Sequence, residues 1–130
     1  MNARPRYPVG SLTSAGISPK PGVYALYRDG SAIYVGKAKS LGTRLWTNHF
    51  RRGKSMTNSA LRRNVAEFLG IALSADIKAG RYRPTADDAL HVSDWIRAGE
   101  VGWIECETEA EAIALEDALK AEWKPPLTKI

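Results

Sequence analysis

The sequence predicts an α/β fold of the α+β kind, in which a small, mainly antiparallel three-stranded sheet is flanked by helices. Three observations predict it. Two runs rich in β-branched and aromatic residues flank the turn pair Asp29-Gly30, which is typical of a hairpin. A third such run lies at residues 101–106, and a capped helix follows it. The length of 130 residues, 44% of them hydrophobic, fits one domain with its own core.

Residues 1–20 are predicted to form an N-terminal arm. They contain three prolines and several Ser and Thr residues, and they show no clear periodicity. The folded domain is therefore expected over residues 21–130. Within it, the stretch from about 53 to 100 is expected to form a helical insertion before the third strand.

The loop length of the hairpin decides where its two central tyrosines point. A two-residue loop would pair Tyr24 with Val35 and place Tyr24 and Tyr34 on opposite faces of the sheet. A three-residue loop, residues 28–30, would pair Tyr24 with Tyr34 directly. Because glycine at the third loop position favours the longer loop with a bulge, we expect both tyrosines on one face.

A first helix is predicted to follow the hairpin. Ser40 can cap it, and it should run to about Phe50. Leu41 and Leu45 lie one turn apart and are expected to face the core. Spacings of i, i+4 and i+7 place three polar residues together on a neighbouring face: Arg44, Asn48 and Arg51.

The insertion is predicted to be mainly helical. One helix is expected over residues 58–69, and Gly70 would end or interrupt it. Its apolar positions follow the helical period: Leu61, Val65, Phe68 and Leu69. Residues 71–78 either extend this helix or form a short separate piece. Thr85, with Asp88 three positions later, indicates a capped helix ending near residue 97, although residues 89–92 could instead be extended.

The last helix carries a carboxylate where a core residue is expected. The capping box Thr108-x-x-Glu111 begins this helix, and Lys124-Pro125-Pro126 ends it. Glu116 lies inside the stripe that should face the sheet, whose other members are Ala112, Leu115, Leu119 and Trp123. A buried carboxylate must be paired, metal-bound or protonated, because an unpaired buried charge is costly. A rim position, or an ion pair with an arginine of the first helix, is the alternative.

The net charge of +5 is unevenly distributed along the chain. Residues 1–65 contain twelve Lys and Arg against one acid, whereas residues 66–130 contain seven against thirteen acids. A basic half of this kind indicates a polyanionic partner, most often nucleic acid, or else a solvated basic surface. The single cysteine, Cys106, excludes an internal disulfide and a multi-cysteine zinc site, and it fits a reducing, cytoplasmic location. Apolar runs are too short to span a membrane, and residues 1–10 lack the apolar segment of a signal peptide.

The hairpin and the last helix together resemble the GIY-YIG nuclease superfamily. Gly22-Val23-Tyr24 and Tyr34-Val35-Gly36 are separated by nine residues, which is the spacing of that signature. The run from Pro21 to Leu45 is similar to the N-terminal nuclease domain of bacterial excision-repair endonucleases. Residues 108–116 and 123–125 are similar to the metal-binding helix of that domain and the segment after it. The resemblance covers residues 21 to about 128 and implies a GIY-YIG-like nuclease domain over 21–130.

The resemblance implies a phosphodiesterase that cleaves DNA by water attack at a single-metal site. Glu116 would bind the cation, Mg²⁺ or Mn²⁺, because hard cations prefer oxygen ligands. Arg44 would hold a non-bridging phosphate oxygen. Tyr24 and Tyr34 would line the site, and one of them would orient or deprotonate the attacking water. Lys37, directly after the second strand, would be the nearby cation.

Further residues are implied around this centre. His49 is an alternative base or a phosphate contact. Basic side chains near the centre and in the insertion are expected to contact phosphates without reading base sequence: Lys37, Lys39, Arg51, Arg52, Lys54, Arg62 and Arg63. The alternative for the arginines is a solvated helix face. Thr128 departs from the family pattern, because the superfamily often has asparagine there.

Three hypotheses on function follow. The first is a metal-dependent DNA endonuclease, which the presence of every expected catalytic residue type favours. The second is a nucleic-acid-binding module that keeps the fold and does not cleave. The third is a nuclease that is active only with a partner protein. A homodimer also stays open, because duplex cutting by one site requires a dimer or sequential nicks.

Overall fold

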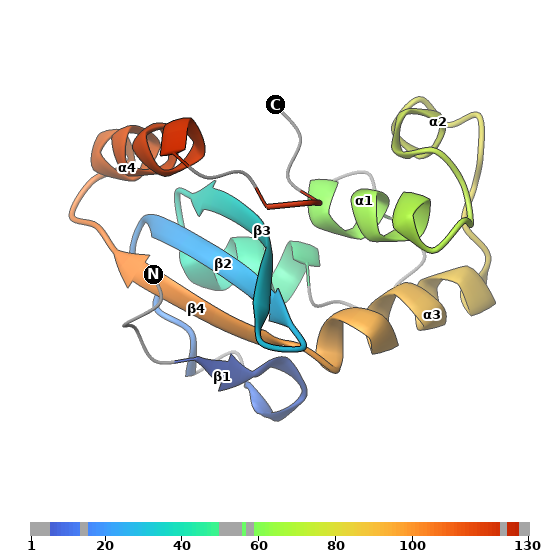
Figure 1. Ribbon diagram of the computed structural model, residues 1–130, viewed down its shortest axis with the longest axis horizontal. Coiled ribbons are helices and arrows are strands. Elements are labelled where there is room, and N and C mark those ends of the chain that lie inside the picture. Colours follow the sequence, from blue (N-terminus) through green and yellow to red (C-terminus); the bar gives the residue numbers. More distant parts are fainter. Residues whose placement is uncertain (1–5, 14–15, 50–55, 57–58, 123–124, 128–130) are drawn as a thin grey trace.

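A computed structural model describes residues 6–13, 16–49, 56, 59–122 and 125–127, without the side chains of 47–49. It consists of one four-stranded antiparallel sheet, in the order β1-β4-β2-β3, with helices around it (Figure 1). The strands are β1 (Tyr7–Pro8), β2 (Gly22–Arg28), β3 (Ser31–Ala38) and β4 (Glu100–Glu105). The helices are η1 (Val9–Ser11), η3 (Thr43–His49), α1 (Ala60–Phe68), α2 (Ser74–Lys78), α3 (Ala86–Arg97) and α4 (Glu109–Glu122).

The α+β class is confirmed, but the sheet has one strand more than predicted. The extra strand, β1, lies inside the expected N-terminal arm, where Tyr7 pairs with Val101 of β4. The arm also contributes to the core, because Val9 and Ile17 are buried. A two-residue strand in a proline-containing segment has no periodicity to detect, so sequence patterns did not predict it.

The hairpin brings both tyrosines to one face by a different route from the one predicted. Its loop has two residues, because Arg28 pairs with Ser31, and both Asp29 (φ 52°) and Gly30 (φ 80°) are left-handed. This combination is the turn that matches strand twist in a hairpin. The register then shifts between Leu26 and Tyr27, so that Tyr24 pairs with Gly36 and Leu26 with Tyr34. The bulge in β3, rather than a longer loop, restores the common face.

Different helices cover the two faces of the sheet. One face carries Tyr24, Leu26 and Tyr34, and it packs in the main core with Leu41 and Leu45 and with α1 and α3. The other face carries Val23 and Val35, and α4 packs on it through Ala112. Figure 1 shows α4 on one side of the sheet, and it shows α1, α2 and α3 of the insertion beyond one end of the sheet.

The segment after the hairpin is helical, as predicted, but it is π-helical. The Ser40 hydroxyl accepts a hydrogen bond from the Thr43 amide at 3.4 Å, which confirms the cap. Leu41 and Leu45 are fully buried, as expected. Because a π-helix is wider than an α-helix, the predicted common face of Arg44, Asn48 and Arg51 does not follow from its spacing.

The insertion contains three described helices, and side chains cap two of them. Ser59 caps α1 by accepting from the Arg62 amide, and Thr85 and Asp88 form the capping box predicted for α3. Gly70, with a φ of 79°, follows α1, and α2 is a separate short helix. Leu61 and Val65 are buried as predicted, whereas Phe68 and Leu69 at the end of α1 are exposed and do not extend the core stripe.

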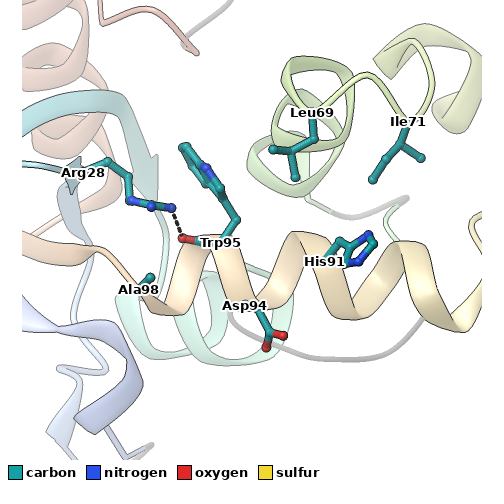
Figure 2. A pocket seen from close by; sticks show the side chains of 7 residues that line it. All are labelled: Arg28, Leu69, Ile71, His91, Asp94, Trp95 and Ala98. Carbon is teal, nitrogen blue, oxygen red and sulfur yellow. Dashed lines mark hydrogen bonds between the residues drawn. The ribbon is translucent and has the colours of Figure 1, made fainter.

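The insertion is attached to the sheet through α3. The Arg28 guanidinium lies over the Trp95 ring and donates from Nη1 to the Trp95 carbonyl at 2.7 Å (Figure 2). Beside this contact is a hollow of about 460 Å³, which lies between α3 and the residues that follow α1. Its lining includes Leu69, His91 and Asp94. In the described part of the chain, no helix is long and apolar enough to cross a membrane.

Candidate active site

Tyr24 and Tyr34 form a stacked pair on β2 and β3. Their ring centroids lie 6.1 Å apart with an interplanar angle of 24°. The Tyr24 and Tyr34 side chains are hydrogen-bonded to each other. Gly36, opposite Tyr24, makes room for this arrangement: a Cβ built on it would lie 2.5 Å from the Tyr24 hydroxyl and 3.1 Å from Tyr34 Cε1. The second glycine of the signature is therefore required by the position of the tyrosine pair.

Burial governs the protonation of both hydroxyls. Desolvation raises the pKa of Tyr24 well above its usual value, and the nearby Tyr34 raises it further. The Arg44 charge acts in the opposite direction and lowers it. Burial also raises the pKa of Tyr34, while its hydrogen bond with Tyr24 and the charges of Arg44 and Arg63 lower it. Both tyrosines are thus neutral hydrogen-bonding groups near pH 7.

Arg44 lies near the tyrosine pair on the η3 segment. Its side chain is half-buried, and its backbone amide donates to the Ser40 carbonyl at 3.0 Å at the start of that segment. Its charge acts on both tyrosine hydroxyls. The structure therefore gathers Tyr24, Tyr34 and Arg44, as the sequence predicted.

Glu116 is the buried carboxylate predicted on the last helix. It is 4% exposed on the face of α4 that also buries Ala112. Two ammonium groups reach its Oε1: Lys37 Nζ at 3.3 Å, from β3, and Lys120 Nζ at 3.4 Å, one turn further along α4. The ion pairs come from lysines, so the alternative of an arginine from the first helix is wrong. The charge of Glu116 also raises the pKa of both tyrosines, which places it in the same electrostatic environment.

The donor set fits a hard divalent cation held mostly by non-protein oxygens. Within the described residues, no group of three or more His, Cys, Asp or Glu side chains gathers at one point. A fully protein-ligated site of the zinc kind is therefore absent from that part of the chain. One buried carboxylate is sufficient for Mg²⁺, which keeps several waters and takes substrate phosphates as ligands. The two lysines on Glu116 show that this position attracts positive charge.

The expected phosphate contacts on α1 are corrected by the structure. Arg62 is completely buried, and its Nη2 donates to the Ser93 hydroxyl of α3 at 3.3 Å. It therefore cannot contact DNA, nor does it lie on a solvated helix face. Arg63 is 8% exposed, and its Nη1 donates to the Met56 carbonyl at 3.0 Å. Its charge acts on Tyr34, so Arg63 lies at the inner side of the site rather than on an outer surface.

The structure places other expected phosphate contacts only in part. Lys37 lies near the end of β3 and Lys39 directly after the strand, and both residues are exposed. The side chain of His49 lies outside the described residues. So do three basic residues and the departure from the family pattern: Arg51, Arg52, Lys54 and Thr128.

Sequence reasoning missed Lys120 and Asn64 as neighbours of the site, and it expected Arg63 as a phosphate contact rather than as a buried neighbour of Tyr34. Lys120 had a detectable signal, because it lies four residues after Glu116 on the same helix. Asn64 had none. Asn64 Nδ2 donates to the Leu127 carbonyl at 2.9 Å, and the Leu127 amide donates to the Ile33 carbonyl at 2.8 Å, next to Tyr34. The insertion is thus bound to β3 through the C-terminal segment.

Comparisons with known proteins agree with this geometry. A family model described as the GIY-YIG catalytic domain matches residues 15–129. No curated protein matches the sequence.

Among solved structures, the similar ones include GIY-YIG N-terminal endonuclease domains of UvrC from Thermotoga maritima. Two point mutants bound to the catalytic divalent cation are each 21% identical to this chain, with 88% of both chains covered and a TM-score of 0.50. The same domain bound to magnesium is 22% identical, with 85% of both chains covered and a TM-score of 0.48. The first two likenesses show a shared fold.

The family model spans nearly the whole chain, and the charges of Arg44 and Glu116 both act on the hairpin tyrosines. These are the positions through which the sequence resembles the family. The chain therefore belongs to the GIY-YIG family and is a nuclease of this type, with a nucleic acid as its substrate.

Proposed function

We propose that the protein is an endonuclease that hydrolyses DNA phosphodiester bonds by water attack, with one divalent cation in the site. The observation that carries the proposal is the buried carboxylate of Glu116, 4% exposed and held between two ammonium groups. A divalent cation would take the place of one of those ammonium groups beside the carboxylate. The proposal also draws on the similar UvrC domains, which bind a catalytic divalent cation.

Glu116 is the proposed ligand of Mg²⁺ or Mn²⁺. When bound, the cation supplies Lewis-acid polarisation of the phosphate and charge stabilisation at the leaving oxygen. Glu116 itself fixes the position of the positive charge, because α4 holds the carboxylate against the sheet. When no cation is bound, Lys120 compensates the buried charge of the carboxylate.

Arg44 and Lys37 are the proposed phosphate-binding residues. The Arg44 guanidinium is always charged and planar, so it can hold a non-bridging oxygen with two hydrogen bonds and offset charge that develops in the transition state. The Lys37 ammonium group pairs with Glu116, and the Lys37 side chain is 45% exposed. It can therefore turn from the carboxylate toward a phosphate without leaving the site.

Tyr24 and Tyr34 are proposed to orient the attacking water. Burial keeps both hydroxyls protonated near pH 7, so neither is a strong base on its own. A neutral hydroxyl can accept one hydrogen bond and donate another, which fixes a water molecule in direction. A protonated hydroxyl cannot take the proton of the water, so that proton would pass to His49, or to a tyrosine only after this tyrosine has lost its own proton beside the bound cation.

DNA is the proposed substrate, and contacts outside the centre are proposed to be to its phosphates. Lys39 is exposed beside the centre, and Arg51, Arg52 and Lys54 follow η3 in the sequence. Such contacts position the duplex without reading its sequence. We place the enzyme in the cytoplasm, because its single cysteine, Cys106, is a buried free thiol.

Plasmid nicking by the purified protein tests the proposal. Nicking with Mg²⁺ or Mn²⁺ that stops in EDTA is the expected result. DNA binding that weakens with salt, without nicking on supercoiled, linear or branched DNA, would replace the proposal by a non-cleaving binding module. Nicking that requires an added protein fraction would make the enzyme dependent on a partner. Rates that rise with the square of the protein concentration would indicate a homodimer.

A further inference from the structure

A pair of aromatic side chains lies at the sheet edge away from β3. Tyr7 of β1 stacks on Trp103 of β4, with ring centroids 5.1 Å apart and an interplanar angle of 28°. Tyr7 is 41% exposed, whereas Trp103 is half-buried and packs against the main core. Trp103 therefore supports the Tyr7 ring from the core side, and part of the Tyr7 ring stays in contact with solvent.

A hollow of about 460 Å³ lies beside this pair. The two aromatic residues line it together with the loop formed by residues 16–20 and with Glu105. This volume is within the range of small-ligand sites in proteins. The loop is firmly held, because the Leu41 amide donates to the Lys20 carbonyl at 2.9 Å and the Gly42 amide donates to the Ser18 carbonyl at 2.8 Å. The wall of the hollow is thus tied to the segment that carries Arg44.

The charged groups at the hollow pair with one another, and carboxylates outnumber the ammonium group. Lys20 lies 4.0 Å from the Glu105 carboxylate and 3.7 Å from that of Glu107. A phosphate would meet two carboxylates against one ammonium, so the hollow does not favour an anion. A flat, neutral, heteroaromatic group suits it better, because it can stack on Tyr7 while its polar edge faces the ionic rim.

The hollow belongs to the same face of the sheet as the tyrosines of the active site. Trp103 pairs with Tyr24 in the sheet register, and paired residues lie on one face. From β1 to β3 there are three strand spacings, which is about 15 Å. Because buried core side chains cover the sheet between the two, a strand of nucleic acid would have to pass over the protein surface outside them to join Tyr34 and Tyr7.

We propose that the hollow binds an unpaired nucleobase of the substrate, stacked on Tyr7. This inference rests on the proposed function, since it requires a nucleic-acid strand in the site. It assigns the enzyme a preference for DNA with a single-stranded segment next to the cleaved bond, such as an overhang or a flap. The hollow holds the base, and the basic side chains around Arg44 hold the phosphates.

The test compares two DNA probes in EDTA, where cleavage does not interfere. One is a fluorescently labelled blunt duplex, and the other is the same duplex with a short single-stranded overhang. Binding is followed by fluorescence anisotropy. Tyr7→Ala should weaken overhang binding about five- to a hundredfold and leave blunt-duplex binding nearly unchanged, because one stacked base is lost. Tyr7→Phe keeps the ring and should bind like the wild type.

A second variant blocks the hollow without touching the aromatic pair. Gly16 lines the hollow, and a Cβ built on it meets only Thr13 Oγ1, at 3.7 Å, so Gly16→Leu is expected to fold. It should lose the preference for the overhang as Tyr7→Ala does. Thermal melting checks that each variant is folded.

Two results would overturn the inference. If the wild type binds both probes and both variants keep its preference for the overhang, or if they weaken both probes equally, Tyr7 has only a structural role. The proposed function would survive that result. If the wild type binds neither probe, the nucleic-acid substrate itself is wrong, and the inference fails with it.

Discussion

Glu116 and Lys37, which are 79 residues apart in the sequence, meet across the interface of α4 and β3 with Oε1 and Nζ 3.3 Å apart. The Glu116 side chain is 6% exposed and the Lys37 side chain 45% exposed, so the pair joins a buried anion to a cation that solvent reaches. This asymmetry suits a site in which the carboxylate holds a metal ion and the lysine turns to the substrate. Burial of a charge is costly, and the two lysines compensate that of Glu116.

Replacement of Lys120 by methionine should strengthen the binding of the catalytic cation. Lys120 Nζ occupies Glu116 Oε1 at 3.4 Å and would compete with the cation for that oxygen. A partly exposed ion pair contributes about 1 kcal/mol or less, so the Mg²⁺ concentration for half-maximal nicking should fall up to about fivefold. The measurement is a Mg²⁺ titration of the nicking rate.

Lys78→Met is the matched control for that titration. Lys78 is exposed on α2, away from Glu116, and its loss removes the same charge from the protein. If both variants shift the Mg²⁺ dependence equally, the effect is one of net charge. Competition at Glu116 would then be the wrong explanation.

Gly36→Ala should inactivate the enzyme by displacing the tyrosine pair. The added methyl group would lie 2.5 Å from the Tyr24 hydroxyl, and Tyr24 is 1% exposed and cannot turn aside into solvent. Overpacking of this kind typically costs about 1–3 kcal/mol. Urea unfolding measures that loss, and the nicking rate measures the loss of activity at a temperature where the variant is folded.

Gly42→Ala provides the comparison. A Cβ on Gly42 finds its nearest atom, the Ser18 carbonyl oxygen, at 3.5 Å, which is ordinary contact. Its stability and activity should stay close to those of the wild type. Full activity in Gly36→Ala would show that the close approach of Gly36 and Tyr24 has no part in catalysis.

The sequence predicted those parts of the fold that local patterns determine, and it predicted less well those that depend on the packing of distant elements. The capping residues Ser40 and Thr85 and the position of Glu116 on α4 were all visible in the sequence, because caps and helical stripes are local patterns. The common face of Tyr24 and Tyr34 was predicted correctly from the wrong loop, since the turn residues do not encode the bulge in β3 opposite Leu26 and Tyr27.

Arg62 marks the limit of charge-based reasoning about the site. A pair of arginines on a basic helix is typical of a phosphate-binding face, yet Arg62 is fully buried against Ser93. Only the packing of α1 against α3, two elements of the insertion, determines this. The π-helical form of η3 likewise depends on tertiary packing, and β1 is too short to give a pattern.

Arg62→Leu should therefore lower stability without changing DNA binding. Leucine removes the hydrogen bond to Ser93 and leaves that hydroxyl with one partner fewer, so we expect a loss of about 1–3 kcal/mol. Lys39→Ala, at an exposed position, should instead lower affinity and reduce the salt dependence of binding by about one counterion. Salt titrations of DNA affinity distinguish the two. A reduced salt slope in Arg62→Leu would return that arginine to the DNA interface.

Stability should decrease at alkaline pH because of Tyr24. Burial raises its pKa in the folded state above the value of about 10 in the unfolded chain. The resulting stabilisation is complete below pH 10 and is lost as the pH rises from there toward the folded-state pKa. Urea unfolding at several pH values from 8 to 11 should show this decline. In Tyr24→Phe the decline should be shallower but not absent, because burial also raises the pKa of Tyr34 and Tyr27. An unchanged slope in Tyr24→Phe would contradict the burial of its hydroxyl.

The central claim is that the carboxylate of Glu116 holds the catalytic cation, and plasmid nicking by Glu116→Gln beside Asp117→Asn tests it most directly. Both variants lose one negative charge from neighbouring positions of α4, but Asp117 is exposed and Glu116 is buried. The account predicts that Glu116→Gln nicks at least about a hundredfold more slowly at any Mg²⁺ concentration, while Asp117→Asn keeps the wild-type rate and its sensitivity to EDTA. Equal nicking by Glu116→Gln and the wild type would contradict it.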